Sequence, residues 1–244
     1  MKGKKSNQRV GILGYGEIGK ALGKFYKAPL IKDVTRDDGL DGVVILHVCI
    51  PWSDHFSKIV EKEMREIKPA LTIIHSTVVP GTTKKLAKKF KGAVVHSPVR
   101  GIHPYLHEGI KTFVKYIGAD NKKAGQLVQK HLKSLGITTK LLDSSTATEV
   151  AKLLDTTYYG LAIAWHGEMK GITDTFKVNF DDAVTDFNIT YNEGYKTLGK
   201  SNVIRPVLFP PKGPIGGHCV VPNAKILKKY FKSKAIDLIL DYGE

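Results

Sequence analysis

A glycine-rich turn between an apolar strand and a helix is the feature that most constrains the fold of this chain. Residues 9–13 are predicted to form a short buried strand, residues 14–19 carry the pattern G-x-G-x-x-G, and residues 20–26 continue as a helix. In that context the pattern is typical of a dinucleotide-binding turn. Its first glycine makes the turn, the second lets a pyrophosphate approach the backbone, and the third lets the helix pack on the strand.

The residues of this turn are the first candidate cofactor ligands. We expect the phosphates of a nicotinamide dinucleotide to lie at the N-terminal N–H groups of the helix. Asp33, at the end of the next predicted strand (residues 29–34), is placed to accept hydrogen bonds from a ribose diol, which favours NAD. Lys32 and Arg36 leave NADP open as the less favoured cofactor, because they offer charges to a 2′-phosphate. The turn residues expected to contact the cofactor are Gly14, Tyr15, Gly16, Glu17, Ile18 and Gly19.

Apolar runs alternate with helical patterns as far as residue 142. Further strands are predicted at residues 43–50, 71–77, 93–97, 113–118 and 139–142, and helices at residues 56–67 and 124–135, with a lysine-rich helix after residue 83. This alternation predicts an α/β fold with a mostly parallel, doubly wound Rossmann-type sheet. We therefore expect a basic N-terminal segment at residues 1–8 and a cofactor-binding domain at residues 9–143.

A long helical pattern follows the predicted sheet. Residues 144–149 read as its start, with a capping residue and an acid in the first turn, and its apolar residues recur with a period near 3.6: Val150, Leu153, Leu154, Tyr158, Leu161, Trp165, Met169 and Ile172. We expect residues 146–175 to form the core of a two-fold homodimer, although a core helix within one chain fits the same pattern. Further helix is expected at residues 180–192, a cysteine loop at 206–222 and a last amphipathic helix at 224–242. The corresponding domains are residues 144–223 and 224–244.

Composition excludes several classes of protein. The net charge is +15, yet the lysines are spread over many helical segments and arginine is scarce, so we do not expect a nucleic-acid partner. Electrostatic attraction of an anionic small-molecule substrate is enough to account for this positive charge. The chain has two cysteines, no apolar run long enough to span a membrane and no signal-like start, which together predict a cytoplasmic location.

Cys219 closes a second glycine-rich loop that begins at Gly213. Three glycines and a proline let the backbone turn tightly and let another molecule approach closely. Basic neighbours, His218 and Lys212, favour the reactive thiolate form of Cys219. A small buried packing residue is the competing interpretation, because free cysteines are usually buried. Cys49 lies in an apolar run and is expected to be such a core residue.

Four motifs in order make the chain resemble the UDP-glucose/GDP-mannose dehydrogenase family. The glycine turn resembles the family's cofactor turn, and residues 75–82, which include Ser76 and Thr77, resemble its S-T-V-x-P-G-T segment. Residues 149–153 resemble the start of its long central helix, with Lys152 at the position of the catalytic lysine. Residues 213–219 resemble its nucleophile loop. The first motif is common to many families, whereas the ordered set is selective.

The resemblance implies a specific chemistry. Members of this family oxidise the C6 alcohol of a nucleotide sugar to a carboxylate in two hydride transfers to NAD, through a thiohemiacetal and a thioester on a cysteine. Cys219 is then the expected nucleophile, and Lys152 stabilises the oxyanion. Thr77 positions water or the nicotinamide. Pro51 and Ser76 are further expected cofactor contacts, and the expected substrate-binding residues are Arg100, His103, Gly216, Gly217 and His218.

Three departures from the family pattern put the hydrolytic step in question. Val99 stands where the family has a glutamate, Thr156 where it has an asparagine, and Asn223 where it has an aspartate. Thr156 and Asn223 remain candidate catalytic residues because both can hydrogen-bond, although Asn223 cannot act as a base. The chain also ends about where the family's third, nucleotide-sugar-binding domain begins. We therefore expect a shortened member that acts on a smaller substrate or with a partner that completes the site.

Three functions fit these motifs. The first is a cysteine-dependent NAD dehydrogenase for a sugar-like or nucleotide-linked alcohol. The second is a two-electron dehydrogenase of the 3-hydroxyacid or 6-phosphogluconate type, which uses a lysine on a long helix and needs no cysteine. The third is a non-catalytic NAD-binding regulatory protein. The intact cysteine loop favours the first function, and Val99 favours the second.

A metal site is not expected. His103 and His107 are four residues apart, and His96 is nearby in sequence, but Gly101 and Pro104 indicate a loop rather than a helix face. We expect His103 and Arg100 to line the substrate cleft instead.

Overall fold

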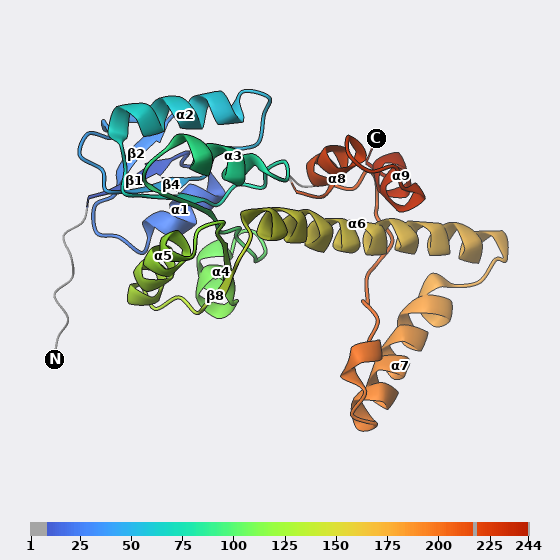
Figure 1. Cartoon of the computed structure of the whole chain (residues 1–244). Helices are drawn as coiled ribbons and strands as arrows, with labels where there is room; N and C mark the ends of the chain where they lie inside the picture. Colours follow the sequence, from blue (N-terminus) through green and yellow to red (C-terminus); the bar gives the residue numbers. More distant parts are fainter. Residues whose placement is uncertain (1–8, 217–218, 244) are drawn as a thin grey trace. The chain divides into compact units, whose positions relative to one another are not determined.

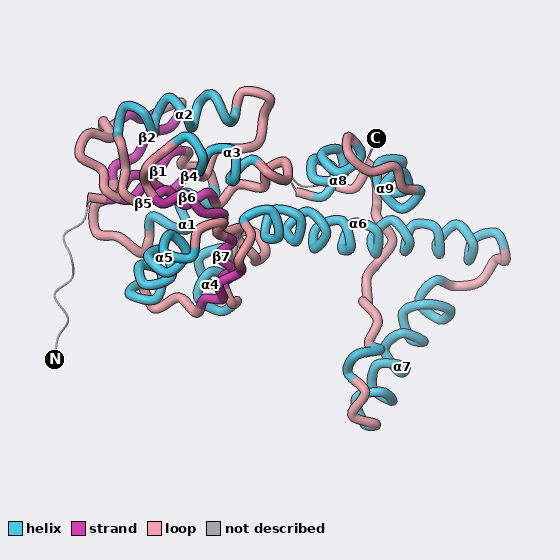
Figure 2. Tube along the Cα trace, viewed as in Figure 1, coloured by secondary structure: helices cyan, strands magenta, loops and turns pink. Residues whose placement is uncertain are grey.

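The computed structural model describes residues 9–216 and 219–243 (Figures 1 and 2). The chain divides into two compact units, Met1–Lys152 and Leu153–Glu244. Each unit has its own core. Among the helices of the described residues, none is long and apolar enough to cross a membrane.

An eight-stranded sheet forms the centre of the first unit, with strand order β3-β2-β1-β4-β5-β6-β7-β8. Neighbouring strands are parallel except for the pairs β2–β3 and β6–β7. The prediction of a mostly parallel, doubly wound sheet is therefore confirmed. The strands are β1 (Val10–Leu13), β2 (Leu30–Asp33), β3 (Arg36–Asp37), β4 (Ile45–Val48), β5 (Leu71–Ile74), β6 (Ala93–His96), β7 (Lys115–Gly118) and β8 (Thr139–Leu142).

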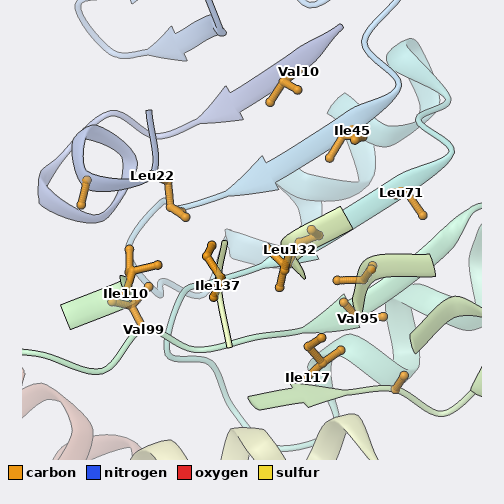
Figure 3. Close-up of a cluster of buried hydrophobic side chains, with 14 of the residues drawn as sticks. Val10, Leu22, Ile45, Leu71, Val95, Val99, Ile110, Ile117, Leu132 and Ile137 are labelled. Atoms are coloured by element: carbon orange, nitrogen blue, oxygen red, sulfur yellow. The ribbon is translucent and has the colours of Figure 1, made fainter. Parts of the chain in front are cut away.

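Helices cover both faces of this sheet, and each face has its own apolar core. Ile45 and Leu46 are adjacent on β4, yet they pack into different clusters because successive strand residues point to opposite faces. Leu22, Ile110 and Leu132 belong to the first cluster (Figure 3), and Phe56 and Leu86 to the second. The helices are α1 (Glu17–Gly23), α2 (Phe56–Ile67), α3 (Thr82–Lys89), α4 (Leu106–Thr112) and α5 (Lys122–Ser134).

The second unit is helical. It comprises most of α6 (Ser145–Thr175), a π-helical turn (Asp181–Thr185), α7 (Asp186–Thr197), a short 3-10 turn (Ser201–Val203), α8 (Val220–Lys228) and α9 (Lys234–Asp241). Small residues on α6 allow the last two helices to approach closely. A Cβ on Gly160 would lie 2.4 Å from the Val220 side chain, and one on Gly167 would lie 2.2 Å from the Tyr242 ring. Ala164, Ala224 and Ile239 fill the core between them.

Three local predictions were wrong. The expected single helix at residues 224–242 is two helices that pack on one another, and the first begins earlier, at Val220. Ser233 ends the connection between them, because its Oγ accepts a hydrogen bond from the Ala235 N–H and caps α9. The expected loop around His107 is the helix α4, and the two-residue edge strand β3 was not predicted.

Candidate functional site

The glycine turn has the geometry that its pattern predicts. Gly14 has a positive φ of 91°, and a Cβ there would lie 2.7 Å from the Ile50 nitrogen. A Cβ on Gly19 would lie 2.1 Å from the Gly14 carbonyl oxygen, so helix and turn pack too closely for any side chain. Gly16, at the N-cap of α1, is different, because no atom lies within 4 Å of its Cβ position. The turn therefore leaves open space at Gly16, where a pyrophosphate fits.

Asp33 lies at the carboxyl end of β2, beside this turn. One of its carboxylate oxygens accepts a hydrogen bond from the Tyr15 N–H, and the other accepts one from the Val34 N–H at 2.7 Å. Each oxygen keeps a lone pair for a further donor such as a ribose hydroxyl. The residues present thus fit a dinucleotide with its diphosphate at Gly16 and its ribose at Asp33.

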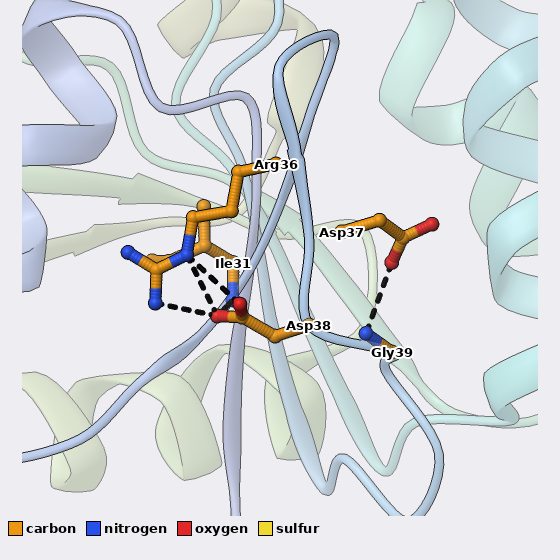
Figure 4. Close-up of polar contacts among 5 residues, drawn as sticks. All are labelled: Ile31, Arg36, Asp37, Asp38 and Gly39. Atoms are coloured by element: carbon orange, nitrogen blue, oxygen red, sulfur yellow. Dashed lines mark hydrogen bonds and ion pairs between the residues drawn. The ribbon is translucent and has the colours of Figure 1, made fainter.

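The two cations that offered a site for a 2′-phosphate are both paired. The Lys32 ammonium lies 2.9 Å from a Glu63 carboxylate oxygen, and the Arg36 guanidinium makes a two-pronged ion pair with Asp38 (Figure 4). Lys32 lies on β2 and its partner Glu63 on α2, whereas Arg36 lies on β3 and Asp38 directly follows that strand.

The start of α1 also contacts a residue expected at the substrate. Glu17 forms an ion pair with the His103 imidazole. Ile18 packs against the first apolar cluster, and the Tyr15 ring lies against Gly23. The structure therefore brings the cofactor turn and His103 together, which their separation of 86 residues in the sequence did not indicate.

The end of β5 carries the S-T-V-x-P-G-T segment. The Ser76 hydroxyl donates a hydrogen bond to the Ile50 carbonyl at 2.6 Å and thus joins the ends of β5 and β4. Thr77 is half-buried, whereas Pro51 is exposed. Because parallel strands end at one edge of the sheet, these residues share an edge with the glycine turn.

Glu149 is a buried carboxylate that holds the other end of this segment. It accepts hydrogen bonds from the Gly81 N–H at 2.6 Å and the Thr83 N–H at 2.8 Å, at the N-terminus of α3. Burial raises its pKa, and the hydrogen bonds from Thr83 and Gly81 oppose that shift. The sequence marked Glu149 only as the first residue of the segment that resembles the start of the family's central helix, since its partners are more than 60 residues away.

Ser97 follows β6, and two buried side chains donate hydrogen bonds to its backbone carbonyl. It accepts hydrogen bonds from the Lys115 ammonium at 2.9 Å and from His75 Nδ1 at 2.8 Å. Lys115 is 4% exposed and also donates to the Pro98 carbonyl at 3.1 Å. Burial lowers the pKa of Lys115 to about 7. Arg100, three residues beyond Ser97, lies over the Phe113 ring with its guanidinium carbon 5.5 Å from the centroid.

His75 continues into a buried chain of hydrogen bonds through His47 and Tyr26 to His131. The links are 2.8 Å each, from His75 Nε2 to His47 Nδ1, from His47 Nε2 to the Tyr26 hydroxyl, and from that hydroxyl to His131 Nε2. Because the Ser97 carbonyl can only accept, His75 carries its proton on Nδ1, and each further link then has one donor and one acceptor. Burial lowers the pKa of all three histidines, so the neutral chain is satisfied throughout.

Lys152 lies on α6, one turn beyond Thr148, and is half-buried. Thr148 hydrogen-bonds His96 Nδ1 at 2.8 Å. Burial is the main cause that lowers the pKa of His96 to about 3, and the positive charges of Lys115 and Lys152 add to it. The Lys152 charge therefore acts at the end of β6, beside Ser97. Val99, where the resemblance places a glutamate, is 4% exposed and packs in the first apolar cluster.

Cys219 belongs to the second unit, at the N-cap of α8, where it is half-buried and forms no disulfide. Its carbonyl accepts a hydrogen bond from the Asn223 N–H at 3.1 Å. Asn223 and Thr156 are both buried, and Gly216 is exposed. Gly217 and His218 lie outside the described residues. The approach of Cys219 to Lys152 stays a prediction.

The apolar stripe of α6 is only partly buried within the chain. Leu153 is buried, but Leu154, Tyr158, Trp165 and Ile172 are each about half or more exposed. A cavity of about 500 Å³ opens beside this stripe, lined by Tyr158, Leu161, Ala162, Trp165, His166, Met169, Asn188, Arg205 and Pro206. In the described part of the chain, no group of three or more His, Cys, Asp or Glu side chains can hold a metal ion.

Comparison with known proteins confirms the resemblance. A UDP-N-acetyl-D-mannosamine dehydrogenase of Pyrococcus horikoshii is 25% identical over 243 residues, which cover 92% of this chain and 55% of that protein. The chain thus spans about half the length of this curated relative. No family model matches the chain.

Two solved structures illustrate the fold. A UDP-glucose dehydrogenase of Pyrobaculum islandicum aligns with a TM-score of 0.74 and 15% identity, covering 100% of this chain and 69% of that one. A 3-hydroxyisobutyrate dehydrogenase of Mycobacterium tuberculosis aligns with a TM-score of 0.69 and 11% identity, covering 96% of this chain and 92% of that one. At these identities the likeness extends to the fold alone.

Proposed function

We propose that this chain is an NAD-dependent dehydrogenase that oxidises an alcohol of a nucleotide sugar or a sugar-like substrate. The observation that carries the proposal is the open glycine turn with Asp33 bonded to it, in a chain similar along 92% of its length to a UDP-N-acetyl-D-mannosamine dehydrogenase. The nicotinamide, when bound, supplies a hydride acceptor. We propose that the oxidised group is a primary alcohol, as the resemblance to the UDP-glucose/GDP-mannose dehydrogenase family implies.

The chain's own residues then have distinct roles. Lys152 stabilises the alkoxide that forms as the substrate alcohol loses its proton to water, and this alkoxide becomes an aldehyde when it gives up a first hydride to the bound nicotinamide. The Cys219 thiolate adds to the resulting aldehyde and gives a thiohemiacetal, which becomes a thioester when it loses a second hydride. Water hydrolyses the thioester and restores the thiol. Thr77, Thr156 and Asn223 position the groups by hydrogen bonds, and we expect slow hydrolysis because Val99 offers no carboxylate.

A two-electron dehydrogenase of the 3-hydroxyacid type is the alternative. The observation that favours it is the fold likeness to a 3-hydroxyisobutyrate dehydrogenase, of which 92% is covered. In that function Lys152 remains the catalytic cation and Cys219 has no chemical role. Counting NADH formed per molecule of a UDP-hexose oxidised distinguishes the two, because the cysteine route yields two and the alternative yields one.

We predict that Asp33→Ala weakens NADH binding about tenfold or more and weakens NADPH binding much less. The variant loses the hydrogen bonds that the carboxylate makes to the ribose diol of NADH. For NADPH, the same carboxylate also repels the 2′-phosphate, so its removal costs less. Fluorescence titration with both cofactors measures the two dissociation constants. Asp41→Ala is the matched control, since Asp41 is an exposed carboxylate away from the turn. Unchanged NADH affinity in Asp33→Ala would show that the ribose assignment is wrong.

We also propose a homodimer formed through α6, because its exposed aromatic and leucine side chains form an apolar surface of the kind that marks a protein–protein interface. The occupant is a second copy, since an extended apolar stripe along one helix is self-complementary about a two-fold axis. Charged residues at Leu161 and Trp165 (Leu161→Glu, Trp165→Glu) should give monomers or insoluble protein. Light scattering at micromolar concentration reads out the mass, and a wild-type mass near 27 kDa would rule out the dimer.

A further inference from the structure

The hairpin of β2 and β3 places a cation directly opposite the residue proposed to bind the ribose. Asp33 and Arg36 are partners in the antiparallel register, and such partners project their side chains from the same face of a sheet. The two side chains nevertheless have separate partners. Asp33 bonds the Tyr15 and Val34 N–H groups, whereas the Arg36 guanidinium turns to Asp38 (Figure 4).

Asp38 holds Arg36 through three hydrogen bonds. Arg36 Nε donates to both carboxylate oxygens, at 2.8 and 3.0 Å, and Nη2 donates to Oδ2 at 2.7 Å. Oδ2 also accepts the Ile31 N–H at 2.9 Å, which fixes the carboxylate to β2. The hydrogen bond from Arg36 is the main cause that lowers the pKa of Asp38, so this carboxylate is ionised and the pair is charged at neutral pH. This pair occupies the Nε donor and one Nη2 donor, which form one of the edges through which an arginine binds a phosphate, and it places the negative charge of Asp38 beside the guanidinium, where it repels a phosphate.

The neighbouring charges also oppose a phosphate. Lys32, the other cation of the hairpin, lies 2.9 Å from Glu63 and 3.8 Å from Asp37. Two cations thus face four carboxylates at this corner, those of Asp33, Asp37, Asp38 and Glu63, in a chain whose overall charge is +15.

We propose that Asp38 is a specificity-determining residue of the cofactor site, because it withholds Arg36 from the 2′-phosphate that distinguishes NADP from NAD. This inference rests on the proposed function, in which the glycine turn and Asp33 bind the dinucleotide. It assigns to Asp33 the recognition of the diol and to Asp38 the exclusion of the phosphate. The chain keeps a phosphate-binding arginine in position but paired.

The test compares NADH and NADPH affinities in the full chain by fluorescence titration. Asp38→Asn keeps the size of the side chain and an oxygen for the Ile31 N–H but releases the Arg36 charge. We expect the ratio of the NADPH to the NADH dissociation constant to fall about tenfold, as one charge-assisted contact becomes available to the phosphate. Asp37→Asn removes an equal charge from the next residue and should leave the ratio within about twofold. The double variant Arg36→Ala/Asp38→Asn should return to the wild-type ratio.

The outcomes separate this inference from the proposed function. A wild type that binds NADH, together with an Asp38→Asn ratio that does not change, overturns the role of Asp38 and leaves the dehydrogenase intact. A gain that persists in the double variant, or that Asp37→Asn reproduces, shows a general charge effect and also overturns it. If no variant and no wild type binds either dinucleotide, the proposed function fails and this inference with it. If Asp38→Asn does not fold, Asp38→Ser is a second variant that frees Arg36 from its ion pair.

Discussion

Replacement of Cys219 by serine is expected to stop formation of the acid product almost completely while a first oxidation survives. Serine can still add to an aldehyde, but an alkoxide is a worse leaving group than a thiolate, so the second stage fails. We expect acid formation to fall by roughly a thousandfold or more, with one NADH per substrate in place of two. Product analysis should then show a released or trapped aldehyde.

The matched control is Cys49→Ala, the other cysteine of the chain. Cys49 packs beside the first apolar cluster, and burial raises the pKa of its thiol, so it is unreactive and its loss should leave the NADH count at two. If wild type instead yields one NADH and Cys219→Ser is as active as wild type, the nucleophile assignment is wrong. In that case Lys152→Ala should be the severe change, as the two-electron alternative requires.

The sheet could be predicted from the sequence because its strands are buried on both faces and read as short apolar runs between helical patterns. The bounds of α2 and β8 agree with the prediction to the residue. The edge strand β3 was missed because Arg36 and Asp37 are exposed and charged, so no apolar pattern marks it. The break between α8 and α9 was missed because Tyr230 and Phe231 continue an apolar pattern while their side chains stay exposed.

In the candidate site, too, local features could be predicted from the sequence and contacts between distant residues could not. The glycine turn is local, so its pattern alone indicated the backbone geometry of Gly14 and Gly19. The contacts of Glu149 with α3 and of Glu17 with His103 join residues far apart in the sequence, and no spacing rule reaches them. His47 and His75 lie inside apolar strands, where the sequence does not distinguish a histidine that bonds another from one that packs alone.

Those buried histidines should make the first unit unfold in mild acid. His47, His75 and His96 are at most 1% exposed, and burial lowers the pKa of each, so they stay neutral in the folded chain below pH 6.5, where the unfolded chain takes up protons. The stability that depends on these neutral histidines is therefore fully present above about pH 6.5 and is lost as the pH falls toward the folded pKa values, about 3 for His96. Lys115, with a pKa near 7, adds no further slope in this range.

With His131, whose pKa burial lowers to about 4, four such histidines lower the free energy of unfolding by about 5 kcal/mol for each pH unit just below pH 6, against a typical total of about 5–15 kcal/mol. We therefore expect loss of the fold between about pH 5 and pH 4. Urea unfolding at several pH values measures this slope, which counts the protons taken up. His96→Gln should reduce the uptake by about one proton whatever its effect on overall stability, whereas His55→Gln, at an exposed position, should leave the uptake unchanged. An uptake that is the same in His96→Gln as in wild type would contradict a neutral, buried His96.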